Sequence, residues 1–347
     1  MSTRRRNKKV RNRDWKADDT ETLRRESRAR REDSGGVEVL AGDDSYFTDI
    51  EPNATVISPY GVLAFAEYEG GEKLCRVDDR LVRGKSSILA PGDRVRLQET
   101  EDNCFIDAVA PRRTRLSRIT GRGREKVFAA NIDQLVVVAS AAQPSFRPGL
   151  VDRYLIVAAI GGVEPVLVVN KMDLVDSEPG EVLVYRELGI PVVQTSCTRK
   201  EPLVALRAQL EGKVSVFAGH SGVGKSSILN VLLPNLDLDT REVSPSSGKG
   251  RHTTSASRLY RLDSTTAVID TPGIRHLGIQ GVDQNQLDLY FSDLAAIAVQ
   301  CKFRDCSHVR EPDCAVLTAK ETGEITPLRY HSYLRIRETL DDGRTSF

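Results

Sequence analysis

Two patterns of apolar residues follow one another along the chain, and the change falls near residue 110. The first consists of short segments that alternate apolar and polar positions, separated by turn residues such as Gly70-Gly71 and Pro91-Gly92. A period of two is typical of strands with one buried face, so this pattern predicts a small β-barrel such as an OB-fold. The five predicted strands are Ala54–Ile57, Val62–Tyr68, Lys73–Val77, Arg94–Glu99 and Cys104–Val109.

The second pattern consists of nearly continuous apolar runs separated by helical periodicity. Strands buried on both faces have this composition, so the pattern predicts a parallel α/β sheet with helices packed against it. Beyond about Asp283 the chain becomes helix-rich, and it ends in the amphipathic stretch Leu328–Thr339. The predicted strands of the sheet are Gln134–Ala139, Val166–Val169, Val192–Thr195, Val214–Ala218 and Ala267–Ile269.

Together the patterns predict a multidomain α/β protein. We expect residues 46–113 to form the OB-fold domain, 114–282 the α/β domain and 283–347 a small helical domain. Residues 1–45 are dense in Arg, Glu and Asp without apolar periodicity, so we expect a disordered basic arm there. No apolar run approaches the ~20 residues that cross a bilayer, and no apolar signal segment follows the charged N-terminus. We therefore expect a soluble, cytoplasmic protein.

The formal net charge is only +1, but the charges are unevenly distributed. The first sixteen residues hold eight Lys and Arg side chains against one Asp. Such an arm can neutralise phosphates, which favours a nucleic-acid partner, although a solubilising tail has the same composition. A second basic stretch from Arg112 to Lys126 fits a linker that faces a polyanion and a solvated connector equally well.

A phosphate-binding loop of the form G-x-x-x-x-G-K-[ST] lies between a predicted strand and a predicted helix, which is the context this motif requires. Its backbone N–H groups are expected to surround the α- and β-phosphates at the positive end of the helix dipole. Lys225 is expected to contact the β- and γ-phosphates, and Ser226 to bind Mg²⁺. The expected nucleotide contacts in this segment are Gly219, His220, Ser221, Gly222, Val223, Gly224, Lys225, Ser226 and Ser227.

Two further loops are expected to recognise the base. The motif N-K-x-D follows one predicted strand, where ligands collect in parallel sheets. Its carboxylate, Asp173, can accept hydrogen bonds from N1–H and the 2-amino group of guanine, which adenine does not offer. Backbone N–H groups after the next strand are expected to contact guanine O6. The predicted base-binding residues are Asn170, Lys171, Met172, Asp173, Thr195, Ser196 and Cys197.

The sequence D-T-P-G closes the strand Ala267–Ile269. Asp270 is expected to hold Mg²⁺ through water, and the N–H of Gly273 to contact the γ-phosphate. The segment Ser244–Thr254 is rich in Ser and Gly, which suits a mobile switch loop in which Thr253 or Thr254 binds Mg²⁺ when GTP is present.

Ile274 follows Gly273 at the position where many GTPases place the glutamine that orients the attacking water. An aliphatic side chain cannot do this, so slow intrinsic hydrolysis is expected, and another group must position the water. The candidate catalytic residues are therefore His252 and Lys225. The alternative is that His252 packs against rRNA or another loop residue.

Four residues near the C-terminus, Cys301, Cys306, His308 and Cys314, follow the spacing C-x4-C-x-H-x5-C. Three thiolates and one imidazole form a closed set suited to structural Zn²⁺, whereas the alternative is a group of scattered free thiols. We expect no disulfides in a cytoplasmic protein. The other three cysteines, Cys75, Cys104 and Cys197, are expected to have ordinary packing or loop roles.

The base-recognition motifs precede the phosphate-binding loop, which reverses the usual small-GTPase order and predicts a circular permutation. With Asn131–Gln134, Leu150–Tyr154, Gly250–Thr254 and the metal spacing, the chain closely resembles the RsgA family, also called YjeQ or YloQ. The resemblance extends from the barrel to the C-terminus. It implies an OB-fold, a permuted P-loop GTPase domain, a C-terminal zinc domain and a role in late maturation of the small ribosomal subunit. The arm at residues 1–45 is not part of the family pattern.

We therefore expect a Mg²⁺-dependent GTP hydrolase that forms GDP and phosphate. The resemblance implies that the 30S subunit activates it, that it binds 16S rRNA, and that it holds one structural Zn²⁺. We expect a monomer without a membrane partner. A non-catalytic RNA-binding assembly factor that uses GTP only as a ligand is the alternative. A third class, a nucleotide-dependent enzyme acting on free RNA, would need a further catalytic constellation.

Overall fold

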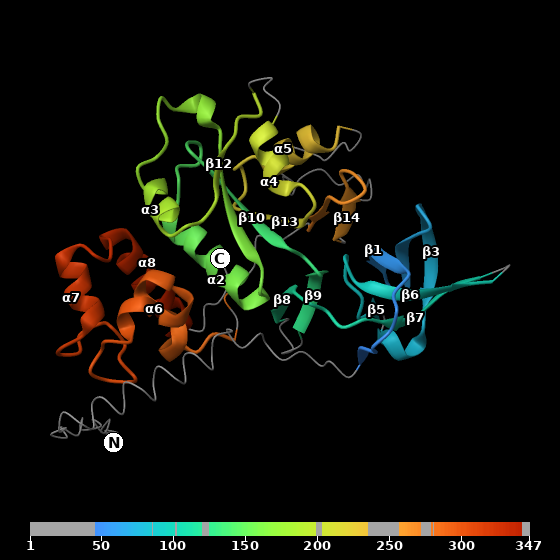
Figure 1. Ribbon diagram of the computed structural model, residues 1–347, viewed down its shortest axis with the longest axis horizontal. Coiled ribbons are helices and arrows are strands. Elements are labelled where there is room, and N and C mark those ends of the chain that lie inside the picture. The colour runs from blue at the N-terminus through green and yellow to red at the C-terminus, as the bar shows by residue number, and fades with distance from the viewer. Residues whose placement is uncertain are drawn as a thin grey trace, which may run out of the picture.

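The computed structural model describes residues 46–84, 86–100, 103–119, 125–198, 203–234, 257–271, 279 and 281–341. Figure 1 shows three parts: a barrel at one end, a sheet with helices on both faces in the centre, and a helical C-terminal segment at the other end. The predicted arm at residues 1–45 lies outside the described residues. None of the helices in the described part of the chain is long and apolar enough to span a membrane.

The N-terminal part is a closed barrel with the strand order β1-β2-β3-β7-β6, which confirms the predicted fold. Inward-facing residues such as Val56, Ala66 and Ile106 are fully buried, because the alternating pattern directs every second side chain into the barrel. The strands are β1 (Ala54–Tyr60), β2 (Leu63–Tyr68), β3 (Gly71–Val77), β6 (Arg94–Glu99) and β7 (Cys104–Val109). The 3-10 helix η2 (Asp79–Leu81) and the short strands β4 (Val82–Arg83) and β5 (Ser86–Ser87) lie between β3 and β6.

The prediction that no disulfide forms is wrong for one pair of cysteines. Cys75 and Cys104 are joined in a disulfide, and their Cα atoms are 4.7 Å apart. The cause is barrel closure, which places β3 beside β7 in parallel pairing at Arg76 and Phe105, the residues that follow the two cysteines. Two residues separated by 29 positions thereby come within the distance that a disulfide requires.

The second basic stretch forms a two-stranded hairpin, β8 (Arg115–Ile119) and β9 (Glu125–Ala130), between the barrel and the sheet. Three of its arginines pair with carboxylates rather than facing outward without partners. Arg112 is 6% exposed and pairs with the fully buried Asp93, while Arg113 pairs with Asp133 and Arg115 with Glu125. These arginines therefore connect parts of the fold. They are neither a linker that faces a polyanion nor a solvated connector, which were the two expected roles.

The segment that follows the hairpin fixes the barrel to the sheet. Asn131 donates to the carbonyl of Gly92 in the barrel and accepts from the N–H of Arg113. Gly92 has a φ of +90°, and a Cβ atom there would lie 2.1 Å from the carbonyl oxygen of Ala130. Only glycine allows this close approach of the two backbones. Asp133 in turn accepts from the N–H of Val214 at the start of a sheet strand.

The central sheet has the order β12-β11-β10-β13-β15-β14, and all pairs of neighbouring strands are parallel except β15 with β14. The five parallel strands are those that the apolar runs predict. They are β10 (Gln134–Ser140), β11 (Glu164–Asn170), β12 (Val192–Gln194), β13 (Val214–Ala218) and β15 (Ala267–Asp270). The edge strand β14 (Arg258–Arg261) pairs antiparallel with β15.

Helices cover both faces of the sheet. The helices α2 (Pro148–Gly161) and α3 (Val182–Glu187) pack against the face that carries Leu135 and Val137. The helices α4 (Val204–Leu210) and α5 (Lys225–Leu232) pack against the opposite face, which carries Val136 and Val138. Successive residues of β10 thus enter different cores, which explains why the whole strand is buried and its sequence is continuously apolar.

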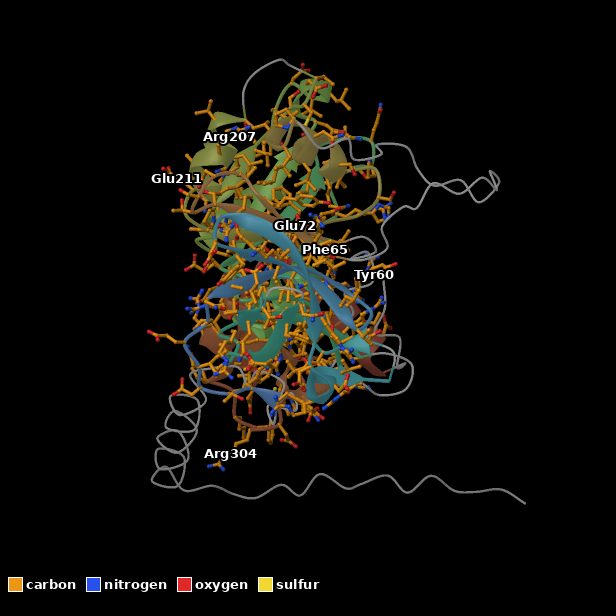
Figure 2. The ribbon with its side chains drawn as sticks, turned by 90° about the vertical axis from the view of Figure 1, so that its right-hand side faces the viewer. Tyr60, Phe65, Glu72, Arg207, Glu211 and Arg304 are labelled. Carbon is orange, nitrogen blue, oxygen red and sulfur yellow. A yellow bond between two sulfur atoms is a disulfide. The ribbon has the colours of Figure 1, made fainter. Side chains whose placement is uncertain are left out.

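The edge strand β14 also contacts the barrel. Arg258 pairs with Glu72 at 2.5 Å, Arg261 pairs with Glu67 at 2.6 Å, and the guanidinium of Arg258 lies 5.7 Å from the ring centroid of Phe65. Figure 2 shows Phe65 and Glu72 on this side of the barrel. The outer face of β2 and β3 therefore carries an intramolecular contact.

The C-terminal segment packs on the outer side of α2 (Figure 1). It consists of the 3-10 helix η5 (Gln284–Tyr290) and the helices α6 (Ser292–Ala298), α7 (Ala315–Thr322) and α8 (Pro327–Asp341). Phe291 and Tyr333 form the centre of its core with their rings 5.6 Å apart, and Ile156 of α2 belongs to the same cluster. The predicted amphipathic stretch Leu328–Thr339 lies within α8.

Candidate nucleotide-binding site and metal centre

The phosphate-binding motif forms the turn between β13 and α5. Gly219 has a φ of +148°, and a Cβ atom there would lie 2.2 Å from the carbonyl oxygen of Val138 on β10. Gly224 has a φ of +96°, and a Cβ atom would lie 2.3 Å from the side-chain nitrogen of Asn170. Both positions exclude any other residue, because the loop is held tightly against two neighbouring strands.

Lys225 begins α5, and its ammonium group folds back into the loop. Its Nζ donates to the carbonyl oxygens of Gly219 at 2.7 Å and His220 at 2.9 Å. Burial raises the pKa of Asp270 at the end of β15, whereas the charge of Lys225 acts to lower it. The two side chains that are expected to serve phosphate and Mg²⁺ thus lie at the start of α5 and at the end of β15, and they interact electrostatically. Ser226 and Ser227 occupy the first turn of α5.

Asn170 links all three loops of the predicted site. Its side chain is 2% exposed, donates to the carbonyl of Val223 in the phosphate-binding loop at 2.8 Å, and accepts from the hydroxyl of Thr195 at 3.0 Å. The sulfur of Cys197 lies 3.9 Å from the same Asn170 oxygen. Burial, and then the charge of Asp173, raises the pKa of the Cys197 thiol. This thiol is therefore unsuited to act as a thiolate nucleophile.

The predicted base-binding residues come together at the carboxyl ends of β11 and β12. Ser196 donates to Asp173 at 2.6 Å, and the N–H of Met172 donates to the carbonyl of Thr195 at 3.2 Å. Lys171 adopts a left-handed conformation with a φ of +61°, and its ammonium group donates to the carbonyl of Gln143. The carboxylate of Asp173 is thus positioned by a neighbouring hydroxyl before any ligand is considered.

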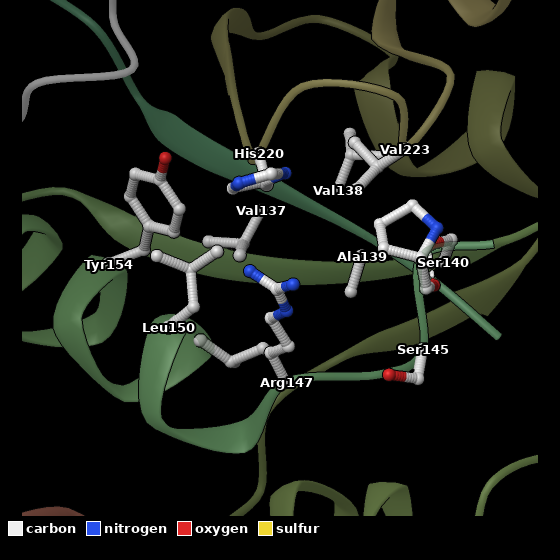
Figure 3. Close-up of a pocket in the computed structure, with 12 residues that line it drawn as sticks. Val137, Val138, Ala139, Ser140, Ser145, Arg147, Leu150, Tyr154, His220 and Val223 are labelled. Atoms are coloured by element: carbon white, nitrogen blue, oxygen red, sulfur yellow. Dashed lines mark hydrogen bonds between the residues drawn. The ribbon is translucent and has the colours of Figure 1, made fainter. Parts of the chain in front are cut away.

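A small cavity of about 20 Å³, enough for a single water molecule, lies beside the phosphate-binding loop. Figure 3 shows His220 above it and Arg147 below it, with Tyr154 at one side. Burial raises the pKa of Tyr154 to about 12. Arg147 belongs to none of the sequence motifs, and its position is marked only by the proline that follows it and begins α2.

Several predicted site residues lie outside the described part of the chain. These are the switch-loop residues His252, Thr253 and Thr254, together with Gly273 and Ile274. The structure brings the remaining predicted nucleotide residues to one edge of the sheet, where β11, β12, β13 and β15 end.

The four predicted metal ligands form one cluster, whose donor atoms all lie within 4.8 Å of one another. Zinc bonds of ~2.3 Å to sulfur and ~2.05 Å to nitrogen imply tetrahedral edges of roughly 3.8 Å between sulfurs and roughly 3.6 Å between sulfur and nitrogen. Cys301 and Cys314 have their sulfurs 3.8 Å apart, and they lie 3.6 Å and 3.5 Å from Nδ1 of His308. The donor set therefore fits a tetrahedral metal ion.

Neighbouring side chains hold the segment from Cys301 to Cys314, here called the metal loop, in place. The other ring nitrogen of His308 faces the carboxylate of Asp288 at 3.7 Å, which is longer than a hydrogen bond. On α8, the hydroxyl of Tyr330 donates to the carbonyl of His308 at 2.8 Å, and that of Tyr333 donates to the carbonyl of Ser307 at 3.0 Å. The metal site is thus built against α8 and η5.

The fold and the site define a circularly permuted GTPase, in which the base-recognition loops precede the phosphate-binding loop along the chain. The structure is similar to the crystal structure of YjeQ from Thermotoga maritima, with 32% identity and a TM-score of 0.66 over 83% of this chain and 98% of that chain. It is also similar to YloQ, described as a circularly permuted GTPase, with 29% identity and a TM-score of 0.65 over 85% and 96% of the two chains.

The sequence matches the family model of the RsgA GTPase over residues 109–280. RsgA of Pseudomonas fluorescens is 38% identical over 324 residues, which are 92% of this chain and 93% of that protein. RsgA of Pseudomonas aeruginosa is 39% identical over the same shares of the two chains. The chain therefore belongs to the RsgA GTPase family, and its activity is GTP hydrolysis with Mg²⁺.

Proposed function

We propose that this GTPase acts in biogenesis of the small ribosomal subunit, where it binds 16S rRNA in late 30S maturation and is activated by the subunit. The observation that carries the proposal is the similarity over nearly the whole chain to proteins named small ribosomal subunit biogenesis GTPase, together with the permuted order of the nucleotide-binding motifs. The protein would act as a cytoplasmic monomer.

For the nucleotide, we assign each predicted residue a role. Asp173 accepts from guanine, Lys171 lies along the base, and backbone N–H groups of Ser196 and Cys197 contact O6. Lys225 neutralises the β- and γ-phosphates. Mg²⁺ supplies charge neutralisation when it is bound with GTP, with Ser226, one of Thr253 and Thr254, and Asp270 available to hold it.

For hydrolysis, we propose that His252 orients the attacking water once the small subunit has ordered the switch loop. Ile274 lacks any group that could orient water, which supports a contribution from elsewhere. The basic arm, the barrel and the C-terminal domain would provide the rRNA contacts. We propose Zn²⁺ as the ion of the Cys/His cluster, with a structural role, since all four positions would be occupied by protein ligands.

The test is multiple-turnover phosphate release by the purified protein, titrated with purified small subunits. The proposal requires turnover that is slow alone and rises with subunit concentration to saturation. Large subunits serve as the control and should not stimulate. If small subunits bind without changing turnover, the proposed activation is wrong. A protein that binds GTP and small subunits without any turnover would be an assembly factor that uses GTP only as a ligand.

A further inference from the structure

Buried ion pairs connect the C-terminal domain to the nucleotide domain. We call the group formed by Arg329, Asp152 and Asp293 the ionic joint. Arg329 on α8 donates to Asp152 on α2, and to both oxygens of Asp293 on α6 at 2.8 Å and 2.9 Å. The side chains of Arg329 and Asp152 are 4% and 0% exposed. The guanidinium also lies 4.5 Å from the ring centroid of Phe291. Burial alone would lower the pKa of Arg329, but the hydrogen bond with Asp293 and the charges of Asp152 and Asp293 raise it, so the guanidinium is charged. Burial raises the pKa of Asp152, whereas the charge of Arg329 acts to lower it.

A joint of this kind fixes orientation more strictly than an apolar contact does. A planar guanidinium held by two carboxylates has one favourable geometry, whereas apolar surfaces can slide over one another. Separating the charges would leave them buried without a partner, which is strongly unfavourable. The domains are therefore expected to move together at this point.

The helix that carries Asp152 starts at the nucleotide site. The loop before α2 lies against two of the three predicted nucleotide-binding loops. The carbonyl of Gln143 accepts from Lys171 in the first base-recognition loop, and Pro144 lines the same cavity as His220 and Val223 of the phosphate-binding loop. Figure 1 shows α2 between this edge of the sheet and the C-terminal helices. A displacement of the phosphate-binding loop would therefore also displace the first turns of α2, which carry Asp152.

The helix that carries Arg329 leads to the metal loop. The next residue, Tyr330, and Tyr333 one turn further donate to the carbonyls of His308 and Ser307. Asp152 and Arg329 are 177 residues apart in the sequence. Their hydrogen bond nevertheless completes a continuous series of contacts from the nucleotide loops to the metal site. This route does not pass through the backbone that connects the end of β15 to η5.

We infer that Arg329 and Asp152 form a positioning pair, through which the C-terminal domain and the nucleotide site sense one another's state. The inference rests on the proposed activation by the small subunit for its effect on turnover. Coupling of two sites is reciprocal, so bound nucleotide must also alter the C-terminal domain in the absence of any ribosome. A pair that only stabilises the fold would produce neither effect.

The test uses the full-length protein with Arg329→Met, which removes the charge and retains an apolar stem. Arg337→Met is the matched control, because Arg337 lies two turns further along α8 and donates to the carbonyl of Gln284 in η5 rather than to Asp152. Zinc content and thermal unfolding establish that each variant is folded. Asp152→Asn, which preserves side-chain volume, provides an independent second variant.

The first measurement is hydrogen exchange of α8 and the metal loop with GDP and with a non-hydrolysable GTP analogue, without ribosomes. The wild type and Arg337→Met should show a nucleotide-dependent difference there, and Arg329→Met and Asp152→Asn should lose it. The second measurement is turnover with small subunits. The stimulation of turnover should be at least ~5-fold smaller in the Arg329 and Asp152 variants than in the wild type, and their unstimulated turnover should stay within about 2-fold of wild type.

The exchange measurement separates this inference from the proposed function. If small subunits fail to stimulate even the wild type, the proposed activation is wrong, but the exchange difference still tests the coupling. Absence of any exchange difference in the wild type overturns the inference. So does its persistence in a folded Arg329→Met protein. If both variants fail to fold, the pair is a structural joint and the inference is also rejected.

Discussion

Single residues connect the loops of the nucleotide site before a ligand is present. Asn170 contacts both Val223 and Thr195, so its amide holds the phosphate-binding loop and the second base-recognition loop at fixed positions. Asp173 is oriented by Ser196 in the same way. Preorganised groups of this kind bind a ligand at a lower entropic cost than groups that must first be ordered. The effects of single substitutions should therefore be specific.

Replacement of Asp173 by Asn should weaken GTP binding by about 10- to 100-fold, because a charge-assisted pair of hydrogen bonds is lost. The same variant should gain affinity for xanthosine triphosphate, whose 2-oxo group can accept from the new amide. Competition binding with the two nucleotides measures the preference. Asp176→Asn, an exposed carboxylate three residues further on, is the control. An unchanged preference in the Asp173 variant would refute base recognition by this residue.

Replacement of Lys225 by Ala should lower turnover by at least ~10²-fold, since its charge stabilises the β- and γ-phosphates in the transition state. Phosphate release under saturating GTP gives the rate. Lys213→Ala is a suitable control because that lysine lies before β13 and donates to Gln134. Near-normal turnover of the Lys225 variant would show that the phosphate-binding loop has been wrongly assigned.

Replacement of His252 by Ala should remove most of the rate gained from small subunits, roughly 100-fold if the imidazole orients the water. GTP affinity and subunit binding should stay near wild type. The comparison variant is His331→Ala, an exposed histidine on α8. Full stimulation of the His252 variant would exclude it as the water-positioning residue, whereas loss of binding together with rate would make it a docking residue.

At the scale of secondary-structure elements, the metal loop has little regular structure of its own. It runs between α6 and α7 and is held by four ligands and by hydrogen bonds from α8. In a domain this small, a bound metal contributes stability that the apolar core alone does not supply. The organisation of α6, α7 and the loop should therefore depend on the ion.

Elemental analysis should find one zinc per chain. Cys306→Ser should lose the metal together with protease resistance between η5 and α8, because the buried loop can no longer be closed around an ion. Cys197→Ser, which lies in a base-recognition loop, should retain the zinc and serves as the control. A protein that lacks metal but keeps full protease resistance in this region would contradict the assignment.

At the scale of the whole molecule, the barrel and the C-terminal domain lie on opposite sides of the nucleotide domain (Figure 1). Each is attached by ionic contacts: Arg258 and Arg261 with the barrel, and Arg329 with α2. A partner that contacts both ends would therefore also act on the nucleotide domain between them. Such a geometry suits a large RNA surface.

Binding to the small subunit should weaken steeply as salt rises. If six or more phosphates are contacted, the affinity should fall by at least ~10³-fold between ~50 and ~200 mM salt. Deletion of residues 1–16, which removes eight basic side chains, should make the salt dependence shallower. GTP affinity of the free protein, measured over the same range, is the control. A binding constant that does not vary with salt would exclude phosphate contacts as the main source of affinity.

Elements whose signals are local could be predicted from the amino-acid sequence. The barrel and sheet strands follow from periodicity within single segments, and the phosphate-binding loop follows from eight consecutive residues whose glycines have no substitute. The metal cluster lies within fourteen residues of the chain, so its spacing alone indicated a common site. The permutation followed from the order of these local motifs.

Contacts between residues far apart in the sequence depend on how the elements pack, and the sequence does not predict them. Arg112 belongs to a basic stretch in the sequence, but the fold places it beside Asp93, and barrel closure joins Cys75 to Cys104. The joint between Asp152 and Arg329 spans 177 positions. No local sequence pattern identifies the partner of a charged group or a thiol, because pairing depends on where separate elements pack. The periodicity of each element specifies its buried face but not its neighbour.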